Sequence, residues 1–146
     1  MISMKDELGI IHHIFDTYNT IAVYGMSTER EKAANNIPKY LKSKGFEILP
    51  INPNHPKILG LKCYPSLLEI EKPVEIIEVF RPSNEAVKIT EEAILRKSLT
   101  NDIQVIWLQK GITNNEAKKL AQDHDILFIQ DRCMYEMHNK LYGGKK

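Results

Sequence analysis

The chain has little of several features that would assign it to a class of protein. Its 146 residues include two cysteines, Cys63 and Cys133, which are too few for the disulfide framework of a small secreted domain. We therefore expect free thiols and a cytoplasmic protein. The sequence has no apolar run of 18 residues, and its start, "MISMKDE", lacks the basic and apolar regions of a signal peptide. No membrane partner is expected.

An excess of charge of either sign is also missing. Lysine and arginine total 20 against 19 for aspartate and glutamate, so the net charge is +1. This balance gives no broad cationic surface, and we expect no nucleic-acid partner. The five histidines do not pair with cysteine or glutamate at metal-ligand spacing, so no metal site is predicted. An anionic ligand would have to be held by local groups.

Short apolar runs alternate with helical patterns along most of the chain. The runs are rich in isoleucine, valine and aromatic residues and cover residues 21–24, 46–51, 76–80, 103–108 and 126–129. Their near-continuous apolarity indicates strands that are covered on both faces, which is typical of a parallel sheet. The sequence therefore predicts an α/β fold in which helices cover both sides of the sheet.

No linker, internal repeat or low-complexity tract divides the sequence. We expect residues 1–146 to form a single domain, because this length is typical of one hydrophobic core. Apolar residues at helical spacing near the start, Leu8, Ile11, Ile14 and Phe15, predict an amphipathic helix at about residues 4–17. That helix would lead into the first strand and pack against the sheet.

The turn after the first strand has features that suit a phosphate group. In an open parallel sheet, ligands bind beyond the carboxyl ends of the strands. Gly25 allows a tight turn, Ser27 offers a hydroxyl, and the helix that follows presents its N-terminus. Arg30 and Lys32 flank this turn and would supply local charge. The alternative is an ordinary turn between strand and helix with solvated charges.

The end of the second strand argues against an ordinary NAD site. Such a site places an acid about 20 residues beyond the glycine loop, where it accepts from the ribose hydroxyl. Asn52 and Pro53 stand there instead, and the sequence contains no complete G-x-G-x-x-G motif. The fold would then hold a phosphate-bearing nucleotide without the usual nicotinamide chemistry.

Three further positions have more than one interpretation. Arg81 directly follows a buried strand, where a cation indicates an anionic ligand or a carboxylate partner. Trp107 lies within an apolar strand, where core packing and ligand contact are both consistent with the pattern. Cys133 follows Arg132, and nearby positive charge lowers a thiol pKa. Because no histidine lies near it in the sequence, we expect a buried structural cysteine instead.

Five blocks of the sequence together resemble one family. The blocks "VYGMS", "GFEILPINPNHPKILGLKCYPSL", "VFRPSNEA", "VIWLQKGITNNEA" and "DRCMYE" resemble, in order and spacing, those of small stand-alone CoA-binding domain proteins. These are relatives of the CoA-binding domain in the α subunit of succinyl-CoA synthetase. The resemblance spans about residues 19–136. It implies a Rossmann-like three-layer α/β/α sandwich whose five-stranded, mostly parallel sheet has the order 3-2-1-4-5, with coenzyme A over its carboxyl edge.

The same resemblance implies which residues contact coenzyme A. They are Gly25, Met26 and Ser27 after the first strand, Asn52 and Pro53 beside the adenine, Phe80, Arg81 and Pro82 after the third strand, and Trp107, Gln109 and Gly111 after the fourth. Many family members have arginine at the position of Lys32 and serine at that of Ala34. Lysine keeps the charge but lacks the planar fork of arginine.

We therefore predict a protein that binds CoA or acyl-CoA as a non-catalytic carrier, sensor or regulatory module. The ligase relatives use further domains and a phosphorylated histidine, and no coupled nucleophile and base can be named here, so no catalytic residue is assigned. One alternative is an NAD(P)-binding enzyme or redox sensor on the same fold. Another is a protein-interaction module, for instance a homodimer, that has lost its ligand.

Overall fold

A parallel sheet of five strands forms the middle layer of the computed structural model, which describes residues 4–143. The strands are β1 (Thr20–Tyr24), β2 (Glu47–Ile51), β5 (Ile76–Val79), β6 (Val105–Leu108) and β7 (Leu127–Ile129). Every neighbouring pair in this sheet is parallel. The predicted α/β class with a five-stranded Rossmann-like sheet is confirmed.

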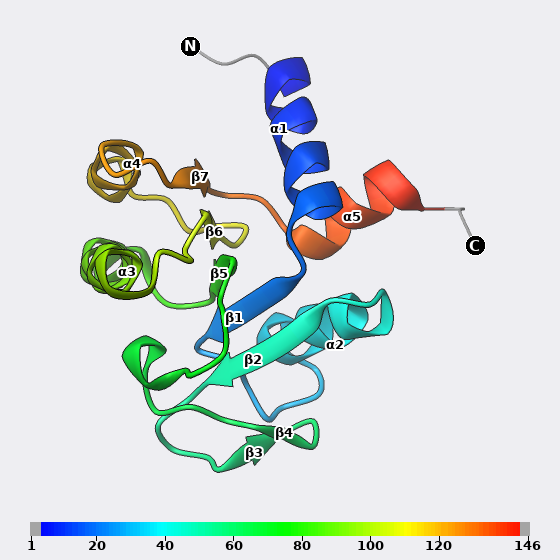
Figure 1. Cartoon of the computed structure of the whole chain (residues 1–146). Helices are drawn as coiled ribbons and strands as arrows, with labels where there is room; N and C mark the ends of the chain where they lie inside the picture. Colours follow the sequence, from blue (N-terminus) through cyan, green and yellow to red (C-terminus); the bar gives the residue numbers. More distant parts are fainter. Residues whose placement is uncertain (1–3, 144–146) are drawn as a thin grey trace.

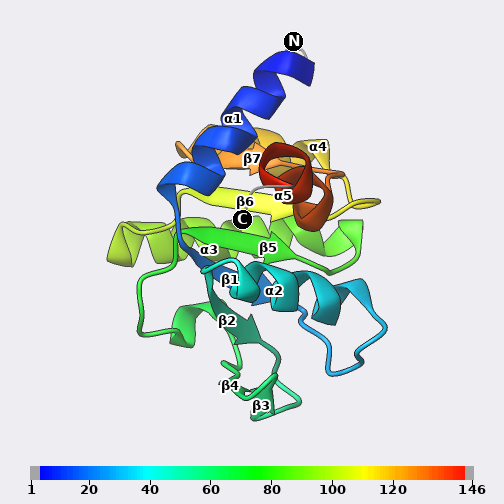
Figure 2. The same ribbon diagram turned by 90° about the vertical axis from the view of Figure 1, so that its right-hand side faces the viewer.

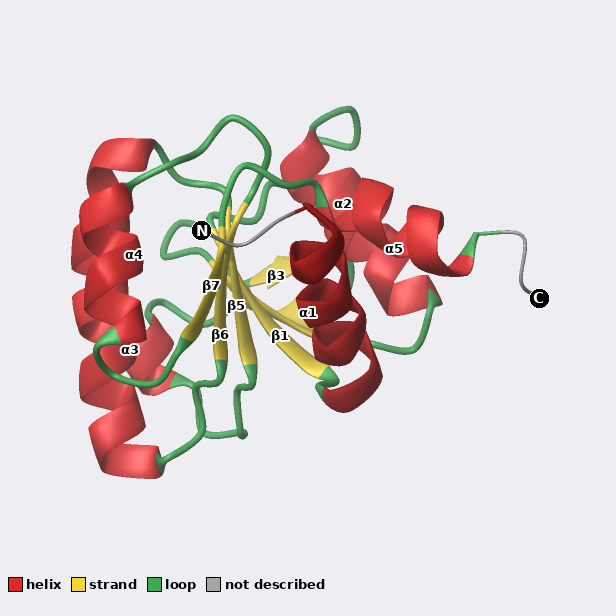
Figure 3. Ribbon diagram, turned by 90° about the horizontal axis from the view of Figure 1, so that it is seen from above, coloured by secondary structure: helices red, strands yellow, loops and turns green. Residues whose placement is uncertain are grey.

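Helices cover both faces of this sheet. One face carries α1 (Met4–Thr17), α2 (Ala33–Ser43) and α5 (Met134–Tyr142), and the other carries α3 (Ala86–Thr100) and α4 (Asn115–Gln122). Figures 1 and 3 show these three layers. Side chains alternate along each strand, so Val23 and Trp107 enter the core under α1, α2 and α5, whereas Ile77 and Ile106 enter the core under α3 and α4.

The order of the strands differs from the prediction at one point. The sheet runs β2-β1-β5-β6-β7, which is 2-1-3-4-5 among its own strands and not 3-2-1-4-5 (Figure 2). The third strand, β5, pairs with β1, and β2 is an edge strand of the sheet, where Pro50 without its N–H is tolerated. Tyr64 bridges the outer edge of β2, donating its N–H to the Pro50 carbonyl at 2.8 Å. The strand order therefore reverses between β1 and β5.

A short hairpin and a 3-10 turn, without an α-helix, connect β2 to β5. The hairpin is formed by β3 (Lys57–Ile58) and β4 (Leu61–Lys62), and the turn, η1, spans Leu67–Glu69. The hairpin lies beyond β2 at the edge of the molecule (Figure 2). Because this connection has so little regular structure, its backbone groups need partners elsewhere.

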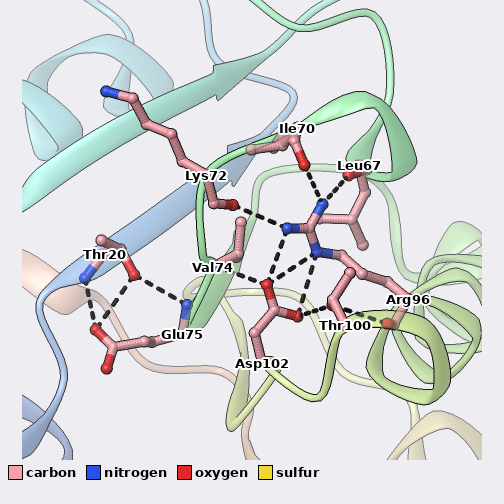
Figure 4. Close-up of polar contacts among 9 residues, drawn as sticks. All are labelled: Thr20, Leu67, Ile70, Lys72, Val74, Glu75, Arg96, Thr100 and Asp102. Carbon is pink, nitrogen blue, oxygen red and sulfur yellow. Dashed lines mark hydrogen bonds and ion pairs between the residues drawn. The ribbon is translucent and has the colours of Figure 1, made fainter.

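Arg96 of α3 supplies those partners (Figure 4). Its Nη1 donates to the carbonyl oxygens of Leu67 and Ile70, both at 2.7 Å, and its Nη2 donates to that of Lys72 at 2.9 Å. The guanidinium also pairs with Asp102 at 2.9 Å, and its side chain is only 3% exposed. One buried cation therefore holds the connection against α3.

Asp102, the acid of this pair, also bonds to the segment before β5 and to the end of α3. Asp102 accepts from the Val74 N–H at 2.9 Å and from the Thr100 hydroxyl at 2.6 Å. Nearby, Thr20 and Glu75 bond to each other at the amino ends of β1 and β5, with the Glu75 N–H donating to Thr20 Oγ1 at 3.0 Å (Figure 4). These contacts hold β5 beside β1.

Glu78 is a titratable side chain inside the core. It lies on β5 between Val23 and Trp107, and its side chain is fully buried. Burial raises the pKa of Glu78 to about 8, against the opposing effect of Gln109, whose Nε2 donates to Oε2 at 2.5 Å. The other carboxyl oxygen, Oε1, has no hydrogen-bond partner among the described residues. Glu78 is therefore protonated in the folded chain at neutral pH.

Removal of the Arg96 side chain should strongly destabilise the protein. Arg96→Ala leaves buried carbonyl groups and the Asp102 carboxylate without partners, and we expect a loss of about 3–5 kcal/mol in the free energy of unfolding. Urea denaturation measures this loss. Lys119→Ala, which breaks an exposed ion pair with Asp123, is the control and should cost less than about 1 kcal/mol. Equal effects of the two substitutions would contradict a structural role for the buried pair.

Glu78 should make stability depend on pH. The folded chain keeps a proton on Glu78 that the unfolded chain releases near pH 4, so this contribution is complete below that pH and is lost as the pH rises to about 8. Between about pH 5 and pH 8, the wild type should therefore lose stability relative to Glu78→Gln, on the order of 1 kcal/mol per pH unit. Urea unfolding of both proteins across this range tests the sign. A constant difference between them would show that Glu78 does not titrate this way.

Candidate functional site

The carboxyl ends of β1, β2 and β5 meet at a pocket of about 330 Å³, which we call the rim pocket. It lies where the strand order reverses, the usual place for a ligand in an open α/β sheet. Four of the predicted site residues come together there, namely Gly25, Asn52, Pro53 and Arg81. The lining is completed by Tyr24, Ile51, Asn54, Pro65 and Glu85.

Gly25 permits the close approach of Arg81 to the first turn. Its φ is +88°, and a Cβ atom added there would lie 2.7 Å from Cδ of Arg81. Its N–H donates to the Ile51 carbonyl at 3.2 Å and so joins the turn to the end of β2. Gly25 therefore allows two strand ends to pack closely. Its own N–H is already bonded to the Ile51 carbonyl.

Asn52 braces the pocket from the end of β2. Its Nδ2 donates to the Met26 carbonyl at 2.9 Å, and its Oδ1 accepts from the Asn54 N–H at 2.8 Å. The Met26 side chain is buried in the core below the turn, so only its backbone takes part. Asn52 thus connects the first and second turns and shapes the wall beside Pro53.

Arg81 is held by Glu85 within the same pocket. Its Nε donates to Glu85 Oε1 at 3.1 Å and its Nη2 donates to Oε2 at 2.8 Å. The hydrogen bond from Arg81 lowers the pKa of Glu85, so the acid is ionised and the pair is neutral as a whole. The two side chains are 46% and 39% exposed, which leaves the guanidinium open to solvent.

Glu85 is a pocket residue that the sequence prediction missed. The prediction looked for an acid after the second strand and found none, whereas the structure brings one in from the segment after β5. The spacing of four residues between Arg81 and Glu85 was the available signal, because such a pair faces one another in a helical turn. Tyr24 was also missed, and its hydroxyl donates to Glu92 of α3 at 2.9 Å.

The polar groups of the loop between β1 and α2 bond to one another and to the first turn of α2. The Ser27 N–H donates to the Ala34 carbonyl at 3.1 Å, and its hydroxyl oxygen accepts from the Glu29 N–H at 3.0 Å. The Ala34 carbonyl is available because Pro38, four residues on in α2, has no N–H to donate to it. Asn35 Nδ2 donates to the Ser27 carbonyl at 2.8 Å. The Ser27 N–H is therefore not directed at a ligand.

The two predicted cations of this loop lie outside the lining of the rim pocket. Lys32 pairs with Glu29 at 2.7 Å, and both side chains are more than half exposed. Arg30 is exposed and forms no ion pair with any residue from 4 to 143. Arg81 is consequently the cation that the structure places at the carboxyl ends of β1, β2 and β5.

A second pocket of about 300 Å³ lies beside the turns that follow β5 and β6, and we call it the second pocket. Phe80 and Gln109, two of the predicted site residues, line this pocket and not the first. The remaining lining residues are Ala33, Ile37, Lys110, Ile112, Cys133 and Glu136. The predicted site thus divides between two neighbouring pockets, joined by the consecutive residues Phe80 and Arg81.

The other predicted residues line neither pocket. Trp107 is completely buried, and its Nε1 donates to the Arg132 carbonyl at 2.7 Å, which corresponds to the packing interpretation of its sequence position. The Gly111 N–H donates to Asp131 Oδ1 at 2.7 Å. Pro82 is exposed and directly precedes the short turn η2 (Ser83–Glu85).

Within residues 4–143, no group of three or more histidine, cysteine and acidic side chains is placed to hold a metal ion, and no helix could cross a membrane. A larger cavity of about 500 Å³ lies along the free edge of β7 and includes Glu7, Asp125 and Lys118. Its acids outnumber its lysine, so it suits a phosphate group less well than the rim pocket.

Comparison with known proteins identifies relatives of two sizes. An uncharacterized protein, YneT, of Bacillus subtilis is 33% identical over 128 residues, which are 88% of this chain and 91% of that protein. The ADP-forming acetate–CoA ligase II of Archaeoglobus fulgidus is 40% identical over 112 residues, which are 75% of this chain but 16% of the ligase.

Solved structures with the same fold include small proteins of similar length. A hypothetical protein from Pyrococcus horikoshii superimposes with a TM-score of 0.86 at 33% identity, covering 93% of this chain and 92% of that one. A protein from Thermus thermophilus gives a TM-score of 0.83 at 29% identity, covering 92% and 98%. The family described as "CoA binding domain" matches residues 19–139, and the chain therefore belongs to the CoA-binding domain family.

Proposed function

We propose that the chain binds CoA or acyl-CoA with its phosphate groups at Arg81, and that it acts as a non-catalytic carrier, sensor or regulatory module. One observation supports this most directly: in a member of the CoA-binding domain family, Arg81 lies across Gly25 in the pocket where the strand order reverses. The chain has a net charge of only +1, so a polyanionic ligand depends on such a local cation.

Binding of a phosphate at Arg81 involves an exchange of partners. Glu85 occupies Nε and Nη2 of the guanidinium, and the N–H groups of Gly25 and Ser27 are bonded to carbonyl oxygens. A phosphate group accepts from the same fork with the same bidentate geometry as a carboxylate. The ligand therefore competes with Glu85, and the affinity is the difference between the two interactions.

The non-catalytic part of the proposal rests on which part of the ligases this chain matches. The chain spans 16% of one acetate–CoA ligase and 18% of another, from Methanocaldococcus jannaschii, so the ligase activity belongs to much longer proteins. We propose that this chain shares only the binding of CoA with the matching segment of those ligases. We propose that any acyl transfer requires a separate partner.

A nicotinamide dinucleotide is the second candidate ligand because Glu85 brings a carboxylate into the rim pocket. In this structure both oxygens of Glu85 accept from Arg81, which reduces their capacity for a ribose hydroxyl. Calorimetric titration of the protein with CoA, acetyl-CoA and NAD decides between the candidates. Tighter binding of NAD than of CoA would overturn the proposal.

Loss of the Arg81 guanidinium should weaken CoA binding. Because it removes a charge-assisted contact with a phosphate, Arg81→Ala should raise the Kd for CoA roughly 10- to 100-fold in calorimetry. Lys72→Ala is a matched control, since Lys72 pairs with Glu47 at 2.9 Å at the opposite end of the sheet. This control should leave the Kd within about threefold of wild type. An unchanged affinity in Arg81→Ala would show that phosphate is held elsewhere.

Removal of the competing acid should have the opposite effect. Glu85→Gln frees the fork of Arg81, so we expect CoA to bind about five- to tenfold more tightly, a gain that disappears when Arg81→Ala is also present. Glu47→Gln controls for the change in net charge, because Glu47 is as exposed as Glu85 and is also paired with a cation, Lys72. Weaker CoA binding in Glu85→Gln would mean that the carboxylate contacts the ligand instead of competing with it.

A further inference from the structure

Lysines gather at the edge of the molecule beyond β2, although the charges of the whole chain nearly cancel. Two neighbouring cavities of about 170 and 290 Å³ lie there, between α2, the edge of β2 and the hairpin of β3 and β4. Lys42 lines both cavities. We call this region the lysine surface, and it consists of Lys39, Lys42, Lys57, Lys62 and Lys72, all exposed, around Leu59 at the tip of the hairpin.

The lysine surface is cationic because few of its charges are paired. Lys72 pairs with Glu47 at 2.9 Å, whereas the other four lysines form no ion pair with any residue from 4 to 143. Five lysines and Glu47 carry a formal charge of +4 together, and since the whole chain carries +1, the remaining residues carry −3. The net charge therefore conceals a cationic edge, which attracts an anionic surface within a Debye length of about 10 Å.

The hairpin holds two of these lysines against each other. Lys57 lies directly opposite Lys62 in the antiparallel pair of β3 and β4. Like charges in this position destabilise a pair of strands. The Nζ atom of Lys62 lies 5.0 Å from the centre of the Tyr64 ring, but within residues 4–143 no carboxylate pairs with either lysine. An anion from outside the chain would relieve this repulsion.

Leu59 occupies the tip of the hairpin in an unfavourable backbone conformation. Its φ is +53° and that of Gly60 is +73°, so both residues of the turn are left-handed. Asparagine followed by glycine is preferred in such a turn, whereas a leucine there is strained. The Leu59 side chain is 37% exposed and lines the larger cavity together with Lys39 and Lys42. An exposed apolar side chain at a strained position among lysines indicates a role other than folding.

The residue types of the lysine surface fit a membrane better than a protein or a nucleic acid. Interfaces between proteins are depleted in lysine and depend on arginine and aromatic side chains. Among the described residues, no arginine lines either cavity, and Phe46 and Tyr64 are each only 8% exposed, which leaves no ring for a base to stack on. Lysines around an apolar tip suit anionic headgroups and the acyl chains beneath them. Lysines also discourage pairing at the edge of a sheet, but an exposed leucine does not serve that purpose.

We propose that the lysine surface docks on an anionic phospholipid membrane, with Leu59 inserted among the headgroups and the lysines beside the phosphates. In Figure 2 the hairpin lies at the end of the molecule opposite the start of α1, where it can reach a flat surface. Residues 55 and 56 separate β3 from Asn54 of the rim pocket, so docking holds that pocket near the bilayer. This inference goes beyond the proposed function, and it departs from the expectation of no membrane partner, which was based on net charge.

Vesicle sedimentation tests the proposal with the wild-type protein in the absence of CoA. Vesicles of equimolar phosphatidylcholine and phosphatidylglycerol should bind the protein at least about tenfold more tightly than phosphatidylcholine vesicles in about 0.1 M salt. The preference should disappear in about 1 M salt, where the Debye length is about 3 Å. Equal binding to the two kinds of vesicle in low salt would overturn the proposal.

Loss of two lysines should weaken binding to the anionic vesicles. The double variant Lys42→Gln/Lys62→Gln should bind about 10- to 30-fold more weakly, because each lysine near an anionic surface contributes about fivefold. Lys88→Gln/Lys119→Gln makes the same change in net charge with two exposed lysines of α3 and α4, on the other face of the sheet. Equal losses in the two double variants would show that net charge governs binding, and the lysine surface would be wrong.

Leu59→Asn separates a role at the membrane from a role in folding. Asparagine suits the left-handed tip, so the urea midpoint should stay equal or rise, while binding to anionic vesicles falls about three- to tenfold with the loss of the apolar side chain. Leu99→Asn is the control, because Leu99 is 72% exposed on α3 and should not affect vesicle binding. Unchanged vesicle binding in Leu59→Asn would contradict insertion of the tip.

A short DNA duplex distinguishes a membrane site from a nucleic-acid site. At micromolar concentration the duplex should leave the fraction bound to vesicles nearly unchanged, because it offers no apolar phase to Leu59. If the duplex displaces the protein and Leu59→Asn binds it as the wild type does, the surface binds nucleic acid and the membrane proposal is wrong. These outcomes are independent of CoA calorimetry, so failure of either proposal leaves the other standing.

Discussion

The pairing of β5 with β1 determines where every candidate site residue lies. Pro50 contributes no N–H to the outer edge of β2, Tyr64 bridges that edge, and the third strand of the sheet lies on the other side of β1. Arg96 then holds the irregular connection in place through buried hydrogen bonds. The strand order therefore reverses beside Gly25, and the turns after β1, β2 and β5 enclose one pocket. Because β5 lies beside β1, Arg81, which follows β5, lies near the middle of the sheet's carboxyl edge.

The candidate site is neutral because its polar groups bind one another. Arg81 is paired with Glu85, Asn52 with the Met26 carbonyl, and Ser27 with the first turn of α2. This arrangement connects the strand ends to one another, and it makes ligand binding an exchange of partners, because few donors are free. In a chain with a net charge of +1, such a site favours ligands whose phosphates outcompete a carboxylate at Arg81.

Much of the fold could be predicted from the sequence, and less of the site. Apolar runs between helical patterns gave the class and all five strands of the sheet, because strands covered on both faces need continuous apolar residues. The predicted strand order was broadly consistent with the sheet, except that the third strand lies beside β1 and not beside β2. Pro50 was a signal that β2 is an edge strand. Gly25, Asn52, Pro53 and Arg81 were predicted and do meet. Glu85 was missed although its spacing from Arg81 was a signal, whereas the role of the buried Glu78 depends on a contact with Gln109, 31 residues away. Whether the predicted residues contact CoA stays a prediction.

The most direct test is a titration of isotope-labelled protein with CoA, followed through the backbone amide chemical shifts of each residue. If CoA binds where the strand order reverses, the largest saturable changes will occur at Gly25, at residues 52–54 and at Arg81, which line the rim pocket. Changes concentrated along residues 126–129, at the larger cavity on the edge of β7, would contradict that account, as would an unchanged Gly25 and Arg81 at saturating CoA.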